Sequence, residues 1–175
     1  MITSVFRKST PLNLFLVVIL MLVFFFISLF QDLSWINSVV SILKKGGLFL
    51  ILLGSIFITN FVAKKNGLSK DSSYTILFYL LFLLFFPSVF ANTNLILSNF
   101  FILLALRRLI SLQSLKASKE KIFDASLWIF VASLFHFWSI LYLVLVFISI
   151  IFMSREIIET GFCHLLLFLP WELFP

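Results

Sequence analysis

The chain has 175 residues, of which 62% are hydrophobic, 18% are aromatic and only 11% are charged. A soluble domain is about half apolar and about one quarter charged, so this composition excludes an ordinary soluble domain. The formal net charge is +6, but the Lys and Arg residues flank long apolar blocks, which indicates membrane topology signals rather than a nucleic-acid-binding surface.

Residue counts exclude several kinds of metal and disulfide chemistry. Cys163 is the only cysteine, so neither an internal disulfide nor a cysteine-built metal site can form. His136 and His164 are the only histidines, which are too few for the histidine boxes of membrane oxygenases. Phosphate-binding glycine loops, nucleophile elbows and His-Glu zinc motifs are absent from the sequence. The sequence therefore predicts no metal and no cofactor.

The first two apolar blocks predict membrane spans at residues 12–30 and 46–63. Arg7 and Lys8 precede the first block, but this block is longer than a signal-peptide core and no small-residue cleavage site follows it, so we expect an uncleaved span. Residues 31–45 have apolar side chains at 3- and 4-residue steps, which predicts an amphipathic helix in the membrane interface. Small and polar residues in the second block mark expected helix-packing positions: Gly54, Ser55, Thr59 and Asn60.

Two further spans are predicted at residues 74–90 and 95–112. Pro87 is expected in the last turn of the third span. The fourth span reaches Arg107 and Arg108 before it is long enough to cross a bilayer. It can still cross if both side chains extend along the helix toward the interface. A lysine-rich polar loop follows it.

The fifth apolar block, residues 125–153, is too long for one simple span. As a straight helix its 29 residues would measure about 43 Å, against about 30 Å for a hydrocarbon core. One strongly tilted helix would fit, and so would two short helices broken near His136, where the break would mark an internal cavity. We expect a transmembrane domain over residues 1–155 and an atypical tail over residues 156–175, whose apolar part is too short for a span.

The distribution of basic residues predicts the orientation of the bundle. With the N-terminus in the cytoplasm and one span at residues 125–153, ten Lys and Arg residues lie in inner segments and three in outer segments. Cytoplasmic loops are enriched in these residues, so the N-terminus is expected in the cytoplasm. Two short helices in the last block would leave this orientation unchanged and would move only the C-terminus. The expected fold is an all-α, polytopic helix bundle of five or six spans in the bacterial inner membrane.

Two positions near span ends are candidate functional sites. Asp32 lies at the start of the first outer segment, where a carboxylate can act as a catalytic acid or base or bind a metal ion. The alternative is a residue that begins a helix at a water-exposed loop. Arg107 and Arg108 present guanidinium groups, whose planar fork matches phosphate oxygens. They are candidates for binding the phosphates of a lipid-linked substrate, and the alternative is an anchor to anionic lipid head groups.

His136 is the third candidate, because it lies inside an apolar block. An ionisable residue at membrane depth is a functional candidate, here as a second catalytic residue beside Asp32. The alternative is a neutral histidine that is hydrogen-bonded to a neighbouring helix or packed among its aromatic neighbours Phe135, Phe137 and Trp138.

Six different short motifs are spread along most of the chain: residues 1–13 (MITSVFRKSTPLN), 65–70 (KNGLSK), 86–88 (FPS), 105–109 (ALRRL), 121–125 (KIFDA) and 132–138 (ASLFHFW). Together they resemble an uncharacterised multi-pass membrane protein family of flavobacteria and their relatives, over residues 1–155. The resemblance implies further spans, because members of that family are longer, and it implies no established activity. The tail departs from the family pattern, so we expect a truncated or frame-shifted copy.

A second, weaker similarity concerns function. An arginine at a span end, a basic loop and the sequence LFHFWS at residues 134–139 resemble polytopic bacterial polysaccharide polymerases and related glycosyltransferases. This similarity implies work on undecaprenyl-linked sugars at the outer face. It also implies that Arg107 and His136 lie near the substrate, with Asp32 in the first outer loop.

Two functional hypotheses follow. The first is an inner-membrane protein that handles undecaprenyl-linked glycans in envelope polysaccharide synthesis, in which Arg107 holds phosphate, His136 lines a cavity and Asp32 acts as acid or base. The second is a non-catalytic scaffold or assembly subunit of an envelope complex, which the lack of a strong catalytic motif favours. The expected partners are the lipid bilayer, a polyprenyl-phosphate-linked glycan and envelope proteins, and no nucleic acid is expected.

Overall fold

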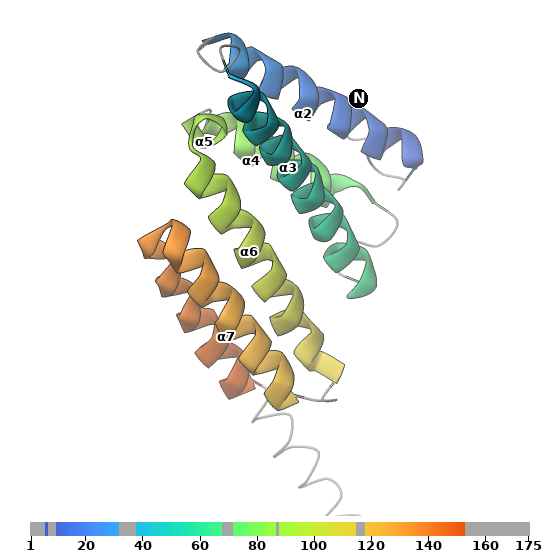
Figure 1. Cartoon of the computed structure of the whole chain (residues 1–175). Coiled ribbons are helices and arrows are strands. Elements are labelled where there is room, and N and C mark those ends of the chain that lie inside the picture. The colour runs from blue at the N-terminus through green and yellow to red at the C-terminus, as the bar shows by residue number, and fades with distance from the viewer. Residues whose placement is uncertain are drawn as a thin grey trace, which may run out of the picture.

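The computed structural model describes Phe6 and residues 10–31, 38–67, 72–86, 88–114 and 118–152 (Figure 1). Every regular element in these ranges is a helix, so the predicted all-α fold class is confirmed. The elements are α2 (Pro11–Gln31), α3 (Val39–Lys65), α4 (Tyr74–Phe85), α5 (Ser88–Ala91), α6 (Thr93–Ile110), η2 (Ser111–Ser114), α7 (Ser118–Phe135) and η3 (Phe137–Tyr142). Asp32 and residues 156–175 lie outside the described residues.

Three of these helices are long and apolar enough to cross a membrane. They cover residues Pro11–Phe30, Val39–Lys65 and Thr93–Ile110, in α2, α3 and α6. Two shorter apolar helices cover Tyr74–Phe85 and Phe137–Phe152. These five segments overlap the five apolar blocks of the sequence, although the last one covers only the second half of residues 125–153, whose first half lies in α7. The number of membrane crossings stays a prediction.

Helix α3 is longer than the sequence predicts. It begins at Val39 and continues through the two adjacent glycines at 46 and 47, so residues 39–45 are its first turns rather than a separate interfacial helix. The backbone hydrogen bond from Ile42 N to Ser38 O, 3.1 Å long, begins this helical pattern. Its 27 residues measure about 40 Å, which exceeds a hydrocarbon core of about 30 Å.

Helix α4 is shorter than predicted, because it ends at Phe85 instead of continuing to Phe90. Phe86 has φ −122° and ψ 73°, outside the helical region. The next residue in the sequence is Pro87, and the ring of a proline disfavours helical backbone at the residue before it. The short helix α5 follows. Helix α6 then begins at a cap in which the Asn92 side chain accepts a hydrogen bond from the Asn94 backbone, 3.1 Å long.

The long apolar block folds back on itself. Helix α7 ends at Phe135, His136 is extended with φ −143° and ψ 107°, and a second helical segment covers Phe137–Phe152. We call this second segment the return arm. It lies beside α7 in Figure 1 and packs against it through Leu143, Val146 and Ile150. Of the two arrangements that the sequence allows, the structure has the one with a break at His136.

Helix α6 connects two apolar cores. The first core lies among α2, α3, α4 and the start of α6. The side chains of Met21, Leu52, Ile56 and Ile96 are fully buried in it. The second lies among the end of α6, α7 and the return arm, around Ala105, Ala125 and Ile129. Side chains on the outside of both are largely apolar and exposed, as expected for a surface in contact with lipid chains. The packing of α6 against the helices of both cores therefore holds the bundle together.

A buried hydrogen bond between Ser98 and Ser139 joins α6 to the return arm, and each residue is 2% exposed. We expect Ser139→Ala to lower the free energy of unfolding by about 0.5–1 kcal/mol, because it leaves the Ser98 hydroxyl without this partner in apolar surroundings. Thermal unfolding in detergent measures the effect. The double variant with Ser98→Ala is expected to be less destabilised than the sum of the two single variants, and strict additivity would contradict a direct bond.

Candidate functional site

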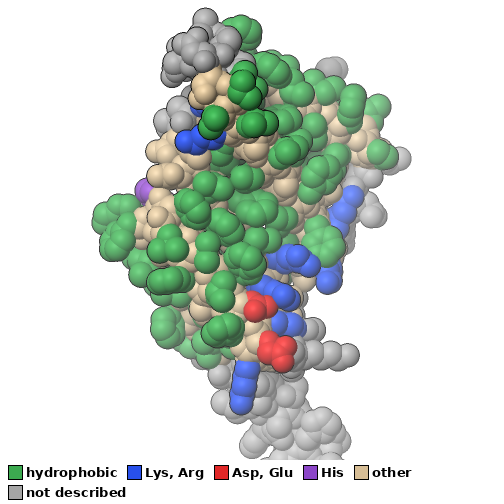
Figure 2. Space-filling model, in the orientation of Figure 1, with side chains coloured by type: hydrophobic (Ala, Val, Ile, Leu, Met, Phe, Trp, Pro, Cys, Tyr) green, Lys and Arg blue, Asp and Glu red, His purple; other side chains and the backbone are tan. Residues whose placement is uncertain are grey.

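Positive charge gathers where α3 and α6 end and α7 begins. The cationic residues there are Lys64, Lys65, Arg107, Arg108, Lys119 and Lys121, against the acidic Glu120 and Asp124. Figure 2 shows Lys and Arg side chains grouped around acidic ones at one end of a largely apolar face. Cations in the last turn of a helix interact favourably with the partial negative charge of its carbonyl end, which suits the positions on α3 and α6.

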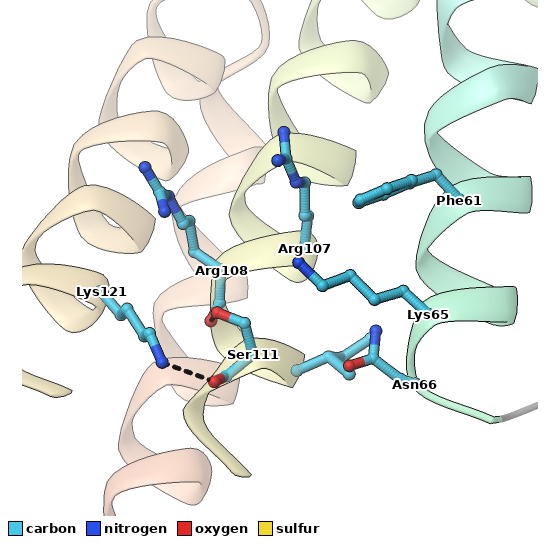
Figure 3. Close-up of a pocket in the computed structure, with 8 residues that line it drawn as sticks. Phe61, Lys65, Asn66, Arg107, Arg108, Ser111 and Lys121 are labelled. Atoms are coloured by element: carbon cyan, nitrogen blue, oxygen red, sulfur yellow. Dashed lines mark hydrogen bonds between the residues drawn. The ribbon is translucent and has the colours of Figure 1, made fainter. Parts of the chain in front are cut away.

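A pocket of about 550 Å³ lies within this charged region (Figure 3). We call it the basic pocket. Helix α3 contributes one wall, the end of α6 with η2 the floor, and the first turn of α7 the other wall. Its lining residues are Phe61, Lys65, Asn66, Arg107, Arg108, Ile110, Ser111 and Lys121.

The Phe61 ring brings two cations together. The Arg107 Cζ atom lies 5.1 Å from the ring centroid and the Lys65 Nζ atom lies 5.3 Å from it. Both distances are within the range of cation–π attraction. In Figure 3 the Lys65 side chain extends from α3 toward Arg107. Neither cation forms an ion pair with a carboxylate among the described residues, so two like charges share one aromatic ring without a compensating anion.

Arg108 and Lys121 already interact with other residues of the protein. The Arg108 Nη2 atom lies 2.9 Å from the Asp124 Oδ2 atom, in a pair whose side chains are 46% and 36% exposed. Lys121 donates a hydrogen bond of 2.8 Å to the backbone carbonyl of Ser111 (Figure 3). The pocket thus contains one compensated arginine, one anchored lysine and the uncompensated pair of Lys65 and Arg107. The pair of Lys65 and Arg107 therefore lacks an anion that would compensate its charge.

A second cavity, of about 460 Å³, lies between α4, α6 and the return arm. We call it the lateral cleft. Its lining residues are Tyr79, Phe82, Leu83, Phe86, Val89, Leu95, Ser98, Asn99, Ile102, His136, Trp138, Ser139 and Tyr142. The Asn99 side chain donates a 2.7 Å hydrogen bond to the Tyr79 hydroxyl. His136 is half-buried at the break between α7 and the return arm.

The structure separates the residues that the sequence selects. Arg107 and Arg108 line the basic pocket together, whereas His136 lines the lateral cleft. On α6, Asn99 of the cleft and Arg107 of the basic pocket are eight residues apart, which is about 12 Å along the helix axis. Asp32 lies outside the described residues, so the structure does not place it relative to either cavity.

Several residues that line the two cavities were not predicted from the sequence as site residues. Phe61 and Lys65 are four residues apart at the end of a predicted span. This spacing puts both side chains on one face of a helix, so the sequence alone predicts that they are neighbours. Their proximity to Arg107 depends on the packing of α3 against α6, for which the sequence contains no comparable signal. Polar residues within apolar segments are expected to form hydrogen bonds between helices. Tyr79 and Asn99 form such a bond.

Comparison with known proteins identifies no relative. No family model, no curated protein and no solved structure matches the chain. The resemblance to an uncharacterised membrane family therefore stays a prediction from the motifs, and the two cavities are the features of the molecule that bear on function.

Proposed function

We propose that this protein is a multi-pass inner-membrane protein that binds the phosphate of a lipid-linked glycan in the basic pocket, as part of envelope polysaccharide synthesis. The observation that supports this most directly is the pair formed by Arg107 and Lys65 on the Phe61 ring, with no carboxylate partner among the described residues. Phosphate oxygens are the natural complement of a guanidinium and an ammonium group that lie against the same aromatic ring.

The position of the pocket suits an amphiphilic ligand. Phe61 is 45% exposed, so the pocket adjoins the apolar outer surface of α3 on one side and the charged helix ends on the other. A lipid phosphate would place its charged group among the cations and its chain along the apolar surface. The three helices that form the pocket end or begin at this level, where a head group would lie if α3 and α6 cross the bilayer.

The proposal gives His136 no role in holding the phosphate, because His136 lies in the other cavity. It also concerns binding rather than a defined reaction. Arg107 and Arg108 both line the basic pocket, among those candidates from the sequence that fall in the described residues, and their chemistry is that of anion recognition.

The proposal is tested by comparing two lipids that differ only in their phosphate. Purified protein in a neutral detergent is titrated with undecaprenyl phosphate and with undecaprenol, and binding is measured by native mass spectrometry. We expect saturable binding of the phosphate and at least about ten-fold weaker binding of the alcohol, which corresponds to about 1.4 kcal/mol. Added salt is expected to weaken only the phosphate complex.

Equal binding of the two lipids would contradict the proposal, because the pocket would then recognise the chain alone. If neither lipid binds and a second protein co-purifies in stoichiometric amount, the scaffold hypothesis replaces it.

A further inference from the structure

The lateral cleft has the composition of a ligand site rather than of a gap between helices. Its volume of about 460 Å³ lies within the range of small-molecule pockets, about 300–1,000 Å³. Five of its lining residues are aromatic: Tyr79, Phe82, Phe86, Trp138 and Tyr142. Trp138 and Phe86 are 66% and 61% exposed, so the cleft opens on the outer, lipid-facing surface of the bundle.

Polar groups lie on both sides of the cleft. Asn99 of α6 donates a hydrogen bond to the hydroxyl of Tyr79 on α4, and this bond leaves the second amide hydrogen and the carbonyl oxygen of Asn99 available. On the side of the return arm lies the imidazole of His136, which forms no side-chain hydrogen bond within the described part of the chain. Polar groups among lipid chains have no water to pair with, so an unused donor facing a cleft at this depth favours an occupant that can accept a hydrogen bond.

We propose that the lateral cleft binds a membrane-dissolved molecule with a quinone-type ring. The aromatic walls suit a planar ring, which stacks or packs edge-on against them. The cleft takes one donor from Asn99 on α6 and one from His136 at the break between α7 and the return arm, and a 1,4-dione has two carbonyl oxygens that can each accept a hydrogen bond. A plain acyl chain would fill the volume but would leave both donors unpaired.

This site is independent of the proposed phosphate site. It shares no lining residue with the basic pocket, and its ligand is uncharged. Each of the two proposals can therefore fail while the other holds.

The test uses Trp138 as a reporter. Purified full-length protein in detergent is titrated with a short-chain ubiquinone, whose ring quenches tryptophan fluorescence, and with an isoprenoid alcohol of the same chain length as competitor. We expect saturable quenching that the alcohol does not reverse. The titration is made in a variant in which the other three tryptophans, Trp35, Trp128 and Trp171, are replaced by Phe, so that the signal comes from Trp138. Adding Trp138→Phe to this variant is expected to remove the saturable quenching.

His136→Ala is expected to weaken quinone binding about ten-fold, the loss of roughly one hydrogen bond. His136→Gln keeps a donor at this position and is expected to retain most of the affinity. Ser133→Ala is the matched control, because the Ser133 hydroxyl bonds to Phe130 of its own helix and does not line the cleft.

Three results would overturn the assignment. One is quenching that rises linearly with quinone, as in empty micelles. Another is an alcohol that competes as well as the ring. The third is a His136→Gln variant that is folded, by its unfolding temperature, but binds no more tightly than His136→Ala.

Discussion

Replacing Gly54 by Leu is expected to lower the free energy of unfolding by about 1–3 kcal/mol, the usual cost of overpacking a close contact. A Cβ atom at position 54 would lie 3.2 Å from the Cε2 atom of Phe100 on α6, which is already tight before the rest of the leucine side chain is added. Phe100 also makes an edge-on contact with Phe101, with ring centroids 5.8 Å apart, and this neighbour limits how far it can move. Thermal unfolding in detergent, followed by circular dichroism, measures the loss.

The matched control is Gly46→Leu in the same helix. A Cβ atom there meets nothing within 4 Å, and leucine has a higher helix propensity than glycine, so this variant is expected to be as stable as the original or more stable. A Gly54→Leu variant that unfolds at the same temperature as Gly46→Leu would show that α3 and α6 do not meet at Gly54.

Arg107→Gln is expected to weaken binding of undecaprenyl phosphate by about 10–100-fold, because it removes a charge-assisted hydrogen bond worth about 1.5–3 kcal/mol. Arg107 shares the Phe61 ring with Lys65 and has no carboxylate partner among the described residues. Arg108→Gln is expected to weaken binding by less than about three-fold, since the Arg108 charge is compensated by Asp124. Titration of each purified variant with the lipid measures the difference.

Two adjacent arginines on one helix therefore give different expected results, although they contribute equally to the net charge. Lys44→Gln tests charge alone, because Lys44 is exposed near the other end of α3 and is expected to have no effect. If all three variants weaken binding equally, the lipid is attracted by overall charge and the basic pocket does not select it.

The sequence predicts those features of the fold that depend on local composition. The blocks at residues 12–30 and 95–112 correspond to α2 and α6 within about two residues, because long apolar runs form helices of bilayer length. Gly54 and Ser55 were expected at helix contacts, and the structure places Gly54 against Phe100 and buries Ser55. Within the predicted interfacial helix at residues 31–45, residues 39–45 are helical, but they are continuous with α3 because the helix does not end at Gly46 and Gly47. Its place in the interface stays a prediction.

The two cavities are predictable only in part. Arg107 and His136 attract attention because charged or ionisable residues are rare in apolar segments. Their assignment to different cavities, however, depends on which face of α6 each neighbouring helix covers, and helix pairing is not contained in the hydropathy of any one segment. Phe61 looks like one of many lipid-facing phenylalanines until the packing of α3 against α6 brings Arg107 over its ring. The role of Asp32 stays a prediction.

The fold-back at His136 has a consequence for biosynthesis. The apolar part of α7, residues 125–135, is about 16 Å long, and the return arm, whose first six residues form a 3-10 helix, is about 27 Å long. Neither reaches across a hydrocarbon core of about 30 Å, so neither is a good substrate for insertion on its own. The two arms bury apolar side chains against each other and against α6. We therefore expect the insertion machinery to release them as a pair, after α6 has left the ribosome and is in place to receive them.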